Sequence, residues 1–314
     1  MTPPRPPLVV VLGSSGPLGA AVVREFAARP VSVRAVSRRH TPCPGTDVEV
    51  RAADLTATGA LAGAVAGADV VIHLVAHRRA GHDWRVSGED RHAERVNTGL
   101  MLDLLAELRR RAGRGAAPVV LFAGSTSQAW GPAVAYDRHK LAAEEALLAA
   151  TRDGVVRGVS LRMPTLYGPG SGHGVVDTML RRALAGSPLP VWGDGAVLRD
   201  LVHVRDAAAA FAAALAEAGA LAGGHWAVGS GEPVTVAELF GRIAWAVAEV
   251  TGRPPVSLTT VPLGPAAVET DLRDHRGSPH EFHRVTGWRA RIPLAQGLRQ
   301  TAAACLRRAP EELP

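Results

Sequence analysis

Short apolar runs alternate with longer amphipathic segments through the first half of the chain. Residues 8–12, LVVVL, form a β-branched run that ends at a glycine, which is typical of a strand buried on both faces of a parallel sheet. LGAAVVREFAAR then has helical spacing, and VSVRAVS predicts a second strand. The alternation continues with predicted strands at 69–76, 118–124 and 156–163 and predicted helices near 91–113 and 136–151. Such an order implies right-handed crossovers, and therefore an α/β fold with a doubly wound parallel sheet.

The pattern changes after about residue 165, where proline and glycine increase and YGPGSGHG and GSPLPVWGDG predict loops. We expect residues 1–165 to form the sheet domain, with segments near 200–230 returning to it. Residues 166–314 should form mainly a smaller C-terminal domain that binds the substrate. The alanine-rich segment 207–223 predicts one packed helix.

Charge and cysteine content narrow the classes of partner. The net charge is +6 and the pI about 10.4, but the arginines are scattered, which disfavours nucleic acid and fits small anions such as diphosphates. Cys43 and Cys305 have no metal-ligand spacing, and none of the twelve histidines has it, so we expect no metal and structural roles for His73, His203 and His225. No apolar run is long enough for a membrane span or a signal peptide, which predicts a cytoplasmic protein.

A glycine-rich turn follows the first predicted strand. GSSGPLG places Gly13, Gly16 and Gly19 at a GxxGxxG spacing that opens a helix. Glycines there allow a tight turn and close approach to a pyrophosphate, which the helix N-terminus attracts. The turn, with Ser15, therefore predicts a dinucleotide site in a Rossmann fold.

The end of the second predicted strand indicates which dinucleotide binds. NAD sites usually have an acidic residue there, whereas this chain has Ser37, Arg38 and Arg39. Guanidinium groups pair with a 2′-phosphate, so we expect NADP(H); the alternative is that both arginines are ordinary surface charges. Asp54 could accept a hydrogen bond from the adenine amino group, or it could cap the next helix.

Tyr136 and Lys140 combine two scarce residue types, since Lys140 is the only lysine and the chain has two tyrosines. On a helix the two side chains share one face, and the ammonium lowers the phenol pKa from about 10 toward working pH. Arginine lacks the compact head that can also reach ribose hydroxyls. The strand at 118–124 ends beside Ser125, Thr126 and Ser127, where a hydroxyl can hold a substrate carbonyl while Tyr136 protonates its oxygen.

The ordered motifs GSSGPLG, AADL, VIHLVAH, ERVNTGL, FAGSTSQAWG, YDRHK, LRMPTLYGPG, WGDGAVLRDLVHVRDAA, HWAVGSG and VTGWRARIPLAQGL cover nearly the whole chain. This series resembles the extended short-chain dehydrogenase/reductases, in the branch that acts on nucleotide-activated sugars.

The resemblance implies catalytic roles for Thr126, Tyr136 and Lys140, with Ser125 and Ser127 as alternatives to Thr126. It implies cofactor contacts for Leu74 and Asn97, with Asn97 bracing the active-site strand and helix. Further assignments are sugar-nucleotide contacts of His77, Arg78, Ser127, Trp192, Arg199 and Arg273. Arg199 would grip the diphosphate, with Arg273 the weaker candidate, although either could form an ordinary surface ion pair. Trp192 could stack on the base or be a core residue.

Two departures from the family pattern affect the expected reaction. Ser127 and Gln128 stand where dehydratases of this branch carry an Asp-Glu pair, which disfavours dehydration. Thr126 and Tyr136 are ten positions apart, whereas most members have a longer substrate-facing loop between them, so the cleft should be more open.

The segments around His77 and Arg78 and the C-terminal tail look most similar to NADPH-dependent 4-ketoreductases of TDP-4-keto-6-deoxyhexoses in bacterial deoxysugar pathways. The alternatives are a nucleotide-sugar 4-epimerase with tightly held NAD and a non-catalytic NADP-sensing protein. The resemblance also implies a homodimer that pairs the helices near 91–113 and 136–151.

Overall fold

The computed structural model describes residues 5–43, 47–77, 90–113, 115–130, 134–172, 174–262, 273–274 and 277–308. Within them, seven strands form one parallel sheet in the order β11-β6-β5-β4-β1-β2-β3. The strands are β1 (Leu8–Leu12), β2 (Ser32–Ser37), β3 (Val48–Ala52), β4 (Val70–His73), β5 (Val119–Ser125), β6 (Arg157–Met163) and β11 (His225–Ala227). The expected doubly wound parallel sheet is confirmed.

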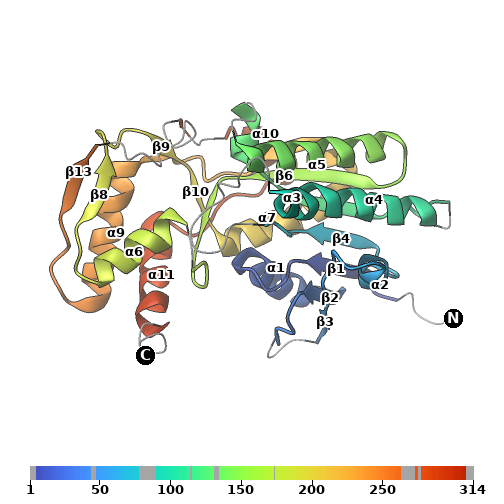
Figure 1. The fold of residues 1–314 in the computed structure, drawn as a ribbon, viewed down its shortest axis with the longest axis horizontal. Helices are drawn as coiled ribbons and strands as arrows, with labels where there is room; N and C mark the ends of the chain where they lie inside the picture. The colour runs from blue at the N-terminus through green and yellow to red at the C-terminus, as the bar shows by residue number, and fades with distance from the viewer. Residues whose placement is uncertain are drawn as a thin grey trace.

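Helices cover both faces of this sheet (Figure 1). On one face lie α1 (Pro17–Ala27) and α7 (Val204–Ala216), and on the other lie α2 (Ala60–Ala64), α4 (Leu100–Arg111) and α5 (Ala135–Arg152). A short α3 (Arg91–Glu94) and a π-helical turn, η1 (Arg95–Gly99), lead directly into α4. Val9 and Val11 pack toward α1 and α7, whereas Val10 and Leu12 pack toward α2 and α4. The uninterrupted apolar run of β1 is thus explained by burial on both sides.

Several elements differ from the sequence predictions, and one of them is the strand Leu189–Trp192, which lies inside the predicted loop GSPLPVWGDG. The predicted helix at 207–223 is wrong as a single element, because α7 ends at Ala216 and α8 (Ala218–Leu221) is separate. The break lets Gly223 donate to the Gly158 carbonyl oxygen, which leads the chain into β11. The sequence analysis did not predict β3 or β11, because β3 alternates charged and apolar residues at the sheet edge and β11 has three residues.

The remaining elements form a smaller lobe beside the sheet (Figure 1). Its two-stranded pairs are β7 (Thr165–Tyr167) with β10 (Leu201–His203), β9 (Leu198–Arg199) with β12 (Val234–Thr235), and β8 (Leu189–Trp192) with β13 (Leu258–Val261). Its helices are α6 (Val175–Leu184), α9 (Val236–Thr251) and α11 (Leu294–Arg308), whereas α10 (His280–Thr286) packs on the sheet domain, with Phe282 in the core that contains α1 and α7. Leu180, Ile243 and Leu298 join α6, α9 and α11 in one apolar core. In the described part of the chain, no helix combines the length and apolarity that a membrane span requires.

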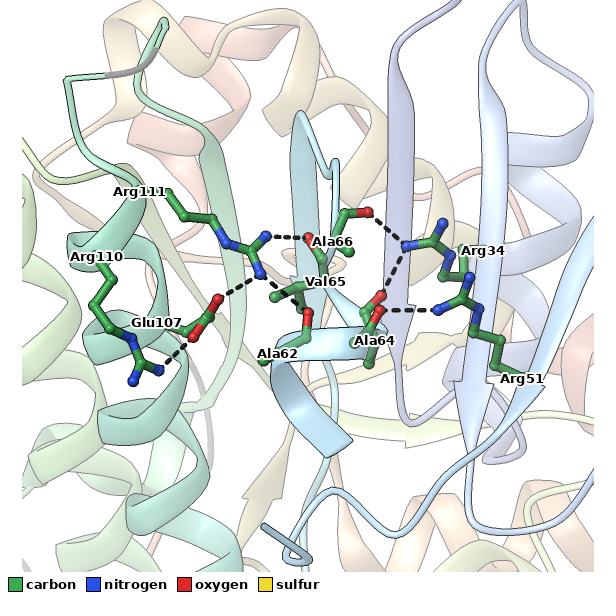
Figure 2. A network of polar contacts seen from close by, with 10 residues as sticks. Arg34, Arg51, Ala62, Ala64, Val65, Ala66, Glu107, Arg110 and Arg111 are labelled. Atoms are coloured by element: carbon green, nitrogen blue, oxygen red, sulfur yellow. Dashed lines mark hydrogen bonds and ion pairs between the residues drawn. The ribbon is translucent and has the colours of Figure 1, made fainter. Parts of the chain in front are cut away.

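Arginines stabilise the short helix α2, as Figure 2 shows. This five-residue helix has no side-chain N-cap, so little within it favours helix formation. Arg111 donates to the carbonyl oxygens of Ala62 and Val65, both at 3.0 Å, from the α4 side. Arg34 of β2 donates to those of Ala64 and Ala66 from the other side. Cations at the C-terminal carbonyls satisfy the free acceptors and oppose the negative end of the helix dipole.

Candidate functional site

The glycine turn lies where the strand order reverses, between the carboxyl ends of β1 and β4. Gly13 has φ +90°, and a Cβ there would come within 3.1 Å of the Leu74 carbonyl carbon. A Cβ on Gly19 would lie 2.2 Å from the Gly13 oxygen, so only glycine lets α1 begin this close to the turn. At Gly16, the N-cap of α1, the nearest atom would be 3.7 Å away. The turn therefore fits a pyrophosphate at the N-terminus of α1, with Ser15 exposed beside it.

The end of β2 carries the residues expected to discriminate between dinucleotides. Ser37 is buried and its hydroxyl donates to the Arg39 carbonyl oxygen at 2.7 Å, while Arg38 and Arg39 are exposed. Asp54, after β3, accepts from the Thr56 backbone N–H and hydroxyl, which is the capping alternative. These bonds lower the pKa of Asp54, and the Arg38 guanidinium lowers it further. Arg38 therefore lies near enough to Asp54 for its charge to act on the carboxyl.

Asn97 fixes the segment that follows β4. It is fully buried in the π-helical turn, its side-chain oxygen accepts from the His77 N–H at 2.7 Å, and its amide group donates to the His77 carbonyl oxygen. These two hydrogen bonds connect η1 with the segment that follows β4. Burial lowers the pKa of His77. The neighbouring His92 and Arg38 lower this pKa further, whereas Asp90 raises it. Arg78, also expected near the substrate, lies outside the described residues.

The three hydroxyl residues predicted after β5 lie together at its carboxyl end. Thr126 begins a 3-10 turn, η2 (Thr126–Trp130), and its side chain is buried. The hydroxyl oxygens of Ser125 and Ser127 are 2.7 Å apart, and Ser127 donates to the Asp137 carboxylate at 2.5 Å. The Gln128 side-chain oxygen accepts from the Ser125 N–H at 2.9 Å. Hydrogen bonds of the Ser125, Ser127 and Gln128 side chains therefore stabilise the turn that carries Thr126.

Tyr136 and Lys140 lie on the first turns of α5, as the spacing predicted. Lys140 is 2% exposed, its ammonium donates to the Ala123 carbonyl oxygen at 2.9 Å, and it lies 5.8 Å from the centroid of the Tyr136 ring. The ammonium thus points into the protein beside the half-buried phenol. Burial, with a contribution from Lys140, lowers the pKa of the adjacent His73 to about 3, so this imidazole stays neutral.

Three of the residues expected to bind the substrate, Trp192, Arg199 and Arg273, come from the part of the chain after residue 165. Arg199 on β9 donates to the carbonyl oxygen of Arg273 at 2.7 Å, so the fold brings together two arginines that are far apart in sequence. Asp274 accepts from the Leu198 N–H at 2.9 Å and fixes this contact. Trp192, at the end of β8, is 37% exposed, so it is not a core tryptophan.

Sequence reasoning missed two contributors to the site. Asp137, the residue after Tyr136, is fully buried against Ser127. Its place next to the predicted acid/base residue was the available signal. Gly277 lies where a Cβ would be 3.4 Å from the Thr126 methyl carbon, so the C-terminal part of the chain reaches the catalytic turn. No spacing in the sequence predicts that approach.

Comparison with known proteins shows which proteins and structures this chain resembles. The chain is 28% identical over 310 residues to a 3-diazoavenalumate denitrifying reductase from Streptomyces sp, covering 91% of this chain and 96% of that protein. Among solved structures, the UDP-glucose 4-epimerase of Thermus thermophilus in complex with NAD is 27% identical, with TM-score 0.77 and coverage of 95% of this chain and 99% of that one. MoeE5, in complex with UDP-glucuronic acid and NAD, is 25% identical, with TM-score 0.77 and coverage of 96% and 99%.

The family model described as the NAD dependent epimerase/dehydratase family matches residues 9–229, which run from β1 past β11 and include the glycine turn, Thr126, Tyr136 and Lys140. The protein therefore belongs to the NAD-dependent epimerase/dehydratase family of NAD(P)-dependent enzymes.

Proposed function

We propose that the protein is a nucleotide-sugar oxidoreductase that interconverts a hydroxyl and a keto group at C4 of the sugar. The single observation that carries this proposal is the buried Lys140 ammonium 5.8 Å from the Tyr136 ring, beside the hydroxyls that end β5. The dinucleotide, when bound at the glycine turn, would exchange a hydride with the sugar carbon. The chain's own residues have to move the matching proton on the sugar oxygen.

Tyr136 is the group proposed to move that proton. Its phenolate accepts the proton from the sugar hydroxyl in one direction, and the phenol returns it in the other. Lys140 stabilises the phenolate by its charge and can bind the cofactor ribose hydroxyls. The Thr126 hydroxyl donates to the same sugar oxygen and holds it near Tyr136.

Arg199 and Arg273 are proposed to bind the diphosphate of the sugar nucleotide. In support, the Arg199 guanidinium donates to the backbone carbonyl oxygen of Arg273, so the two residues meet although they are 74 positions apart. Guanidinium groups suit this ligand because they bind phosphate oxygens in pairs. Trp192 is proposed to stack on the nucleobase, and His77 to lie near the sugar.

The comparisons support a 4-epimerase better than the ketoreductase expected from the sequence. The Thermus thermophilus relative is a UDP-glucose 4-epimerase seen with NAD, and it matches over almost the whole length of both chains. An epimerase removes hydrogen from C4 and returns it to the opposite face of the keto sugar. An epimerase would therefore consume no dinucleotide, because the hydride taken from C4 returns to C4.

The 4-ketoreductase acting on a TDP-4-keto-6-deoxyhexose is the second candidate, and the end of β2 favours it. Arg38 and Arg39 provide cations, and Ser37 no carboxylate, where a 2′-phosphate would lie. NADPH is the dinucleotide that such a reductase consumes. The Streptomyces relative is also a reductase.

The nucleotide carried by the purified protein and its turnover distinguish the candidates. Denaturing the protein and identifying any released dinucleotide comes first. UDP-glucose is then assayed for conversion to its C4 epimer, and TDP-4-keto-6-deoxyglucose for oxidation of added NADPH. Released NAD with epimer formation supports the epimerase, and keto-sugar-dependent NADPH oxidation supports the reductase. Turnover of neither probe, or full activity of Tyr136→Phe, refutes the proposed function.

A further inference from the structure

A hydrogen bond links the residue after Thr126 with the residue after Tyr136. The Ser127 hydroxyl donates to Asp137 Oδ1 at 2.5 Å, joining η2 to the first turn of α5. Both side chains are buried, with Asp137 0% exposed and Ser127 7% exposed. The contact is therefore shielded from water and joins the chain neighbours of the two groups that must meet at one sugar oxygen.

The other contacts of the Asp137 carboxyl do not explain why it is buried. Among the described residues its Oδ2 has no hydrogen-bond partner. Burial raises the pKa of the Asp137 carboxyl, and the bond from Ser127 only partly opposes the rise. A carboxyl with a single hydrogen bond is costly to bury, so its presence calls for a role beyond stability.

This bond and one other hydrogen bond connect α5 with the segment formed by β5 and η2. The other is the bond that the Lys140 ammonium donates to the Ala123 carbonyl oxygen at 2.9 Å. Thr126 lies in the chain between Ala123 and Ser127, and Tyr136 lies one residue before Asp137. The two hydrogen bonds together restrict how far the Thr126 turn can move from the Tyr136 turn, across a link of only ten positions.

We propose that Ser127 and Asp137 are positioning residues, whose hydrogen bond sets the separation of the Thr126 hydroxyl from the Tyr136 phenol. The proposal rests on the proposed function, because it takes Thr126 and Tyr136 as the groups that bind the reacting oxygen. Loss of alignment between reacting groups by about 1 Å can lower a rate about 10²-fold. Loss of the bond should therefore lower kcat while the binding of the nucleotide part, which lies elsewhere, changes little.

The test compares Ser127→Ala, Asp137→Ala, the double variant and Asp137→Asn with the unmodified full chain. Ser160→Ala is the matched control, because the Ser160 hydroxyl donates to the buried Glu144 carboxylate of the same helix at 2.6 Å and takes no part in the Ser127–Asp137 bond. The probes are UDP-glucose for epimerisation and TDP-4-keto-6-deoxyglucose with NADPH for reduction. Thermal unfolding of every variant reports folding separately from activity.

We expect kcat to fall about 10²-fold in Ser127→Ala and Asp137→Ala, with KM nearly unchanged. The double variant should be no slower than either single one, since all three lack the same bond. Asp137→Asn keeps an oxygen acceptor for Ser127 and should recover most of the activity. Ser160→Ala should keep its kcat even where its unfolding temperature falls.

Four results overturn the proposal: full activity of Ser127→Ala, additive losses in the double variant, no recovery in Asp137→Asn, or an equal loss in Ser160→Ala. Tyr136→Phe, measured in parallel, separates these results from failure of the proposed function. An inactive Tyr136→Phe with an active Ser127→Ala refutes the positioning pair alone. An active Tyr136→Phe, or no turnover of either probe by the unmodified chain, refutes both.

Discussion

Replacing Lys140 should raise the pH at which Tyr136 ionises. The ammonium lies 5.8 Å from the ring centroid and is 2% exposed, so little water screens it. At an effective dielectric constant of about 20, opposite unit charges at that distance attract by about 3 kcal/mol. This equals about two pKa units. Lys140→Met removes the charge at similar length, and we expect its Tyr136 to ionise about two pH units higher than in the unmodified chain.

The chain itself makes this measurement possible. It has two tyrosines, Tyr136 and Tyr167. Burial, with Asp206 adding to it, raises the pKa of Tyr167 above its ordinary value of 10.0. Tyrosinate absorbance that develops at lower pH therefore belongs to Tyr136, and Tyr136→Phe gives the baseline spectrum.

Lys140→Arg separates the charge of this residue from its shape. The guanidinium keeps a positive charge near the phenol, so Tyr136 should ionise at a pH close to that of the unmodified chain. Turnover should nevertheless stay low, because the planar head does not replace the compact ammonium at the ribose hydroxyls. If Tyr136 ionises at the same pH in Lys140→Met as in the unmodified chain, the ammonium is not what activates it and the reasoning is wrong.

Three further predictions concern individual contacts. Arg111→Ala should lower the free energy of unfolding, measured by urea titration, by about 1–3 kcal/mol, because it leaves carbonyl acceptors at the end of α2 unpaired. Arg110→Ala is the control: the Arg110 side chain is 70% exposed and contacts Glu107, so its loss should cost less than about 1 kcal/mol. Asp137 binds a proton more tightly when folded, so its contribution to stability is lost as pH rises from its ordinary pKa of 3.8 through the raised value; Asp137→Asn should gain stability relative to the unmodified chain over that window, and a constant difference would contradict this. Arg38→Ala should weaken NADPH binding by about 10-fold to 100-fold in calorimetry and leave NADH binding nearly unchanged, and an equal effect on both would show that Arg38 does not contact a 2′-phosphate.

The sheet could be predicted from the sequence because its central strands are buried on both faces. Continuous apolar runs such as residues 8–12 are then required, and their alternation with helices determines the topology. β3 was missed because an edge strand needs no such run, and its Val48, Glu49 and Val50 look like a polar loop. The break between α7 and α8 was missed because alanine favours helix throughout, and only the hydrogen bond that Gly223 makes to β6 reveals the turn.

The candidate site divides in the same way. Residues that act within one element, such as Tyr136 and Lys140 one turn apart on α5, could be placed from spacing. Residues that meet through tertiary structure could not, which is why the approach of Gly277 to Thr126 and the bond of Ser127 to Asp137 emerge only from the folded chain. Arg199 and Arg273 were each proposed for the diphosphate, but their direct contact depends on how β9 meets the C-terminal segment.

The direction of the proposed reaction depends on the end of β2 more than on the catalytic residues. Tyr136, Lys140 and Thr126 would serve an epimerase and a reductase equally, because each must protonate and deprotonate the same oxygen. A reductase must release its oxidised dinucleotide after every turnover, whereas an epimerase gains by retaining it. The Ser37 hydroxyl donates its hydrogen to the Arg39 carbonyl oxygen, so it has no donor left for a ribose oxygen. The exposed Arg38 and Arg39 are the groups that we propose select the cofactor. Binding through exposed guanidinium groups is screened by salt and favours exchange, so dinucleotide affinity that falls steeply with ionic strength would support the reductase, and salt-insensitive retention the epimerase.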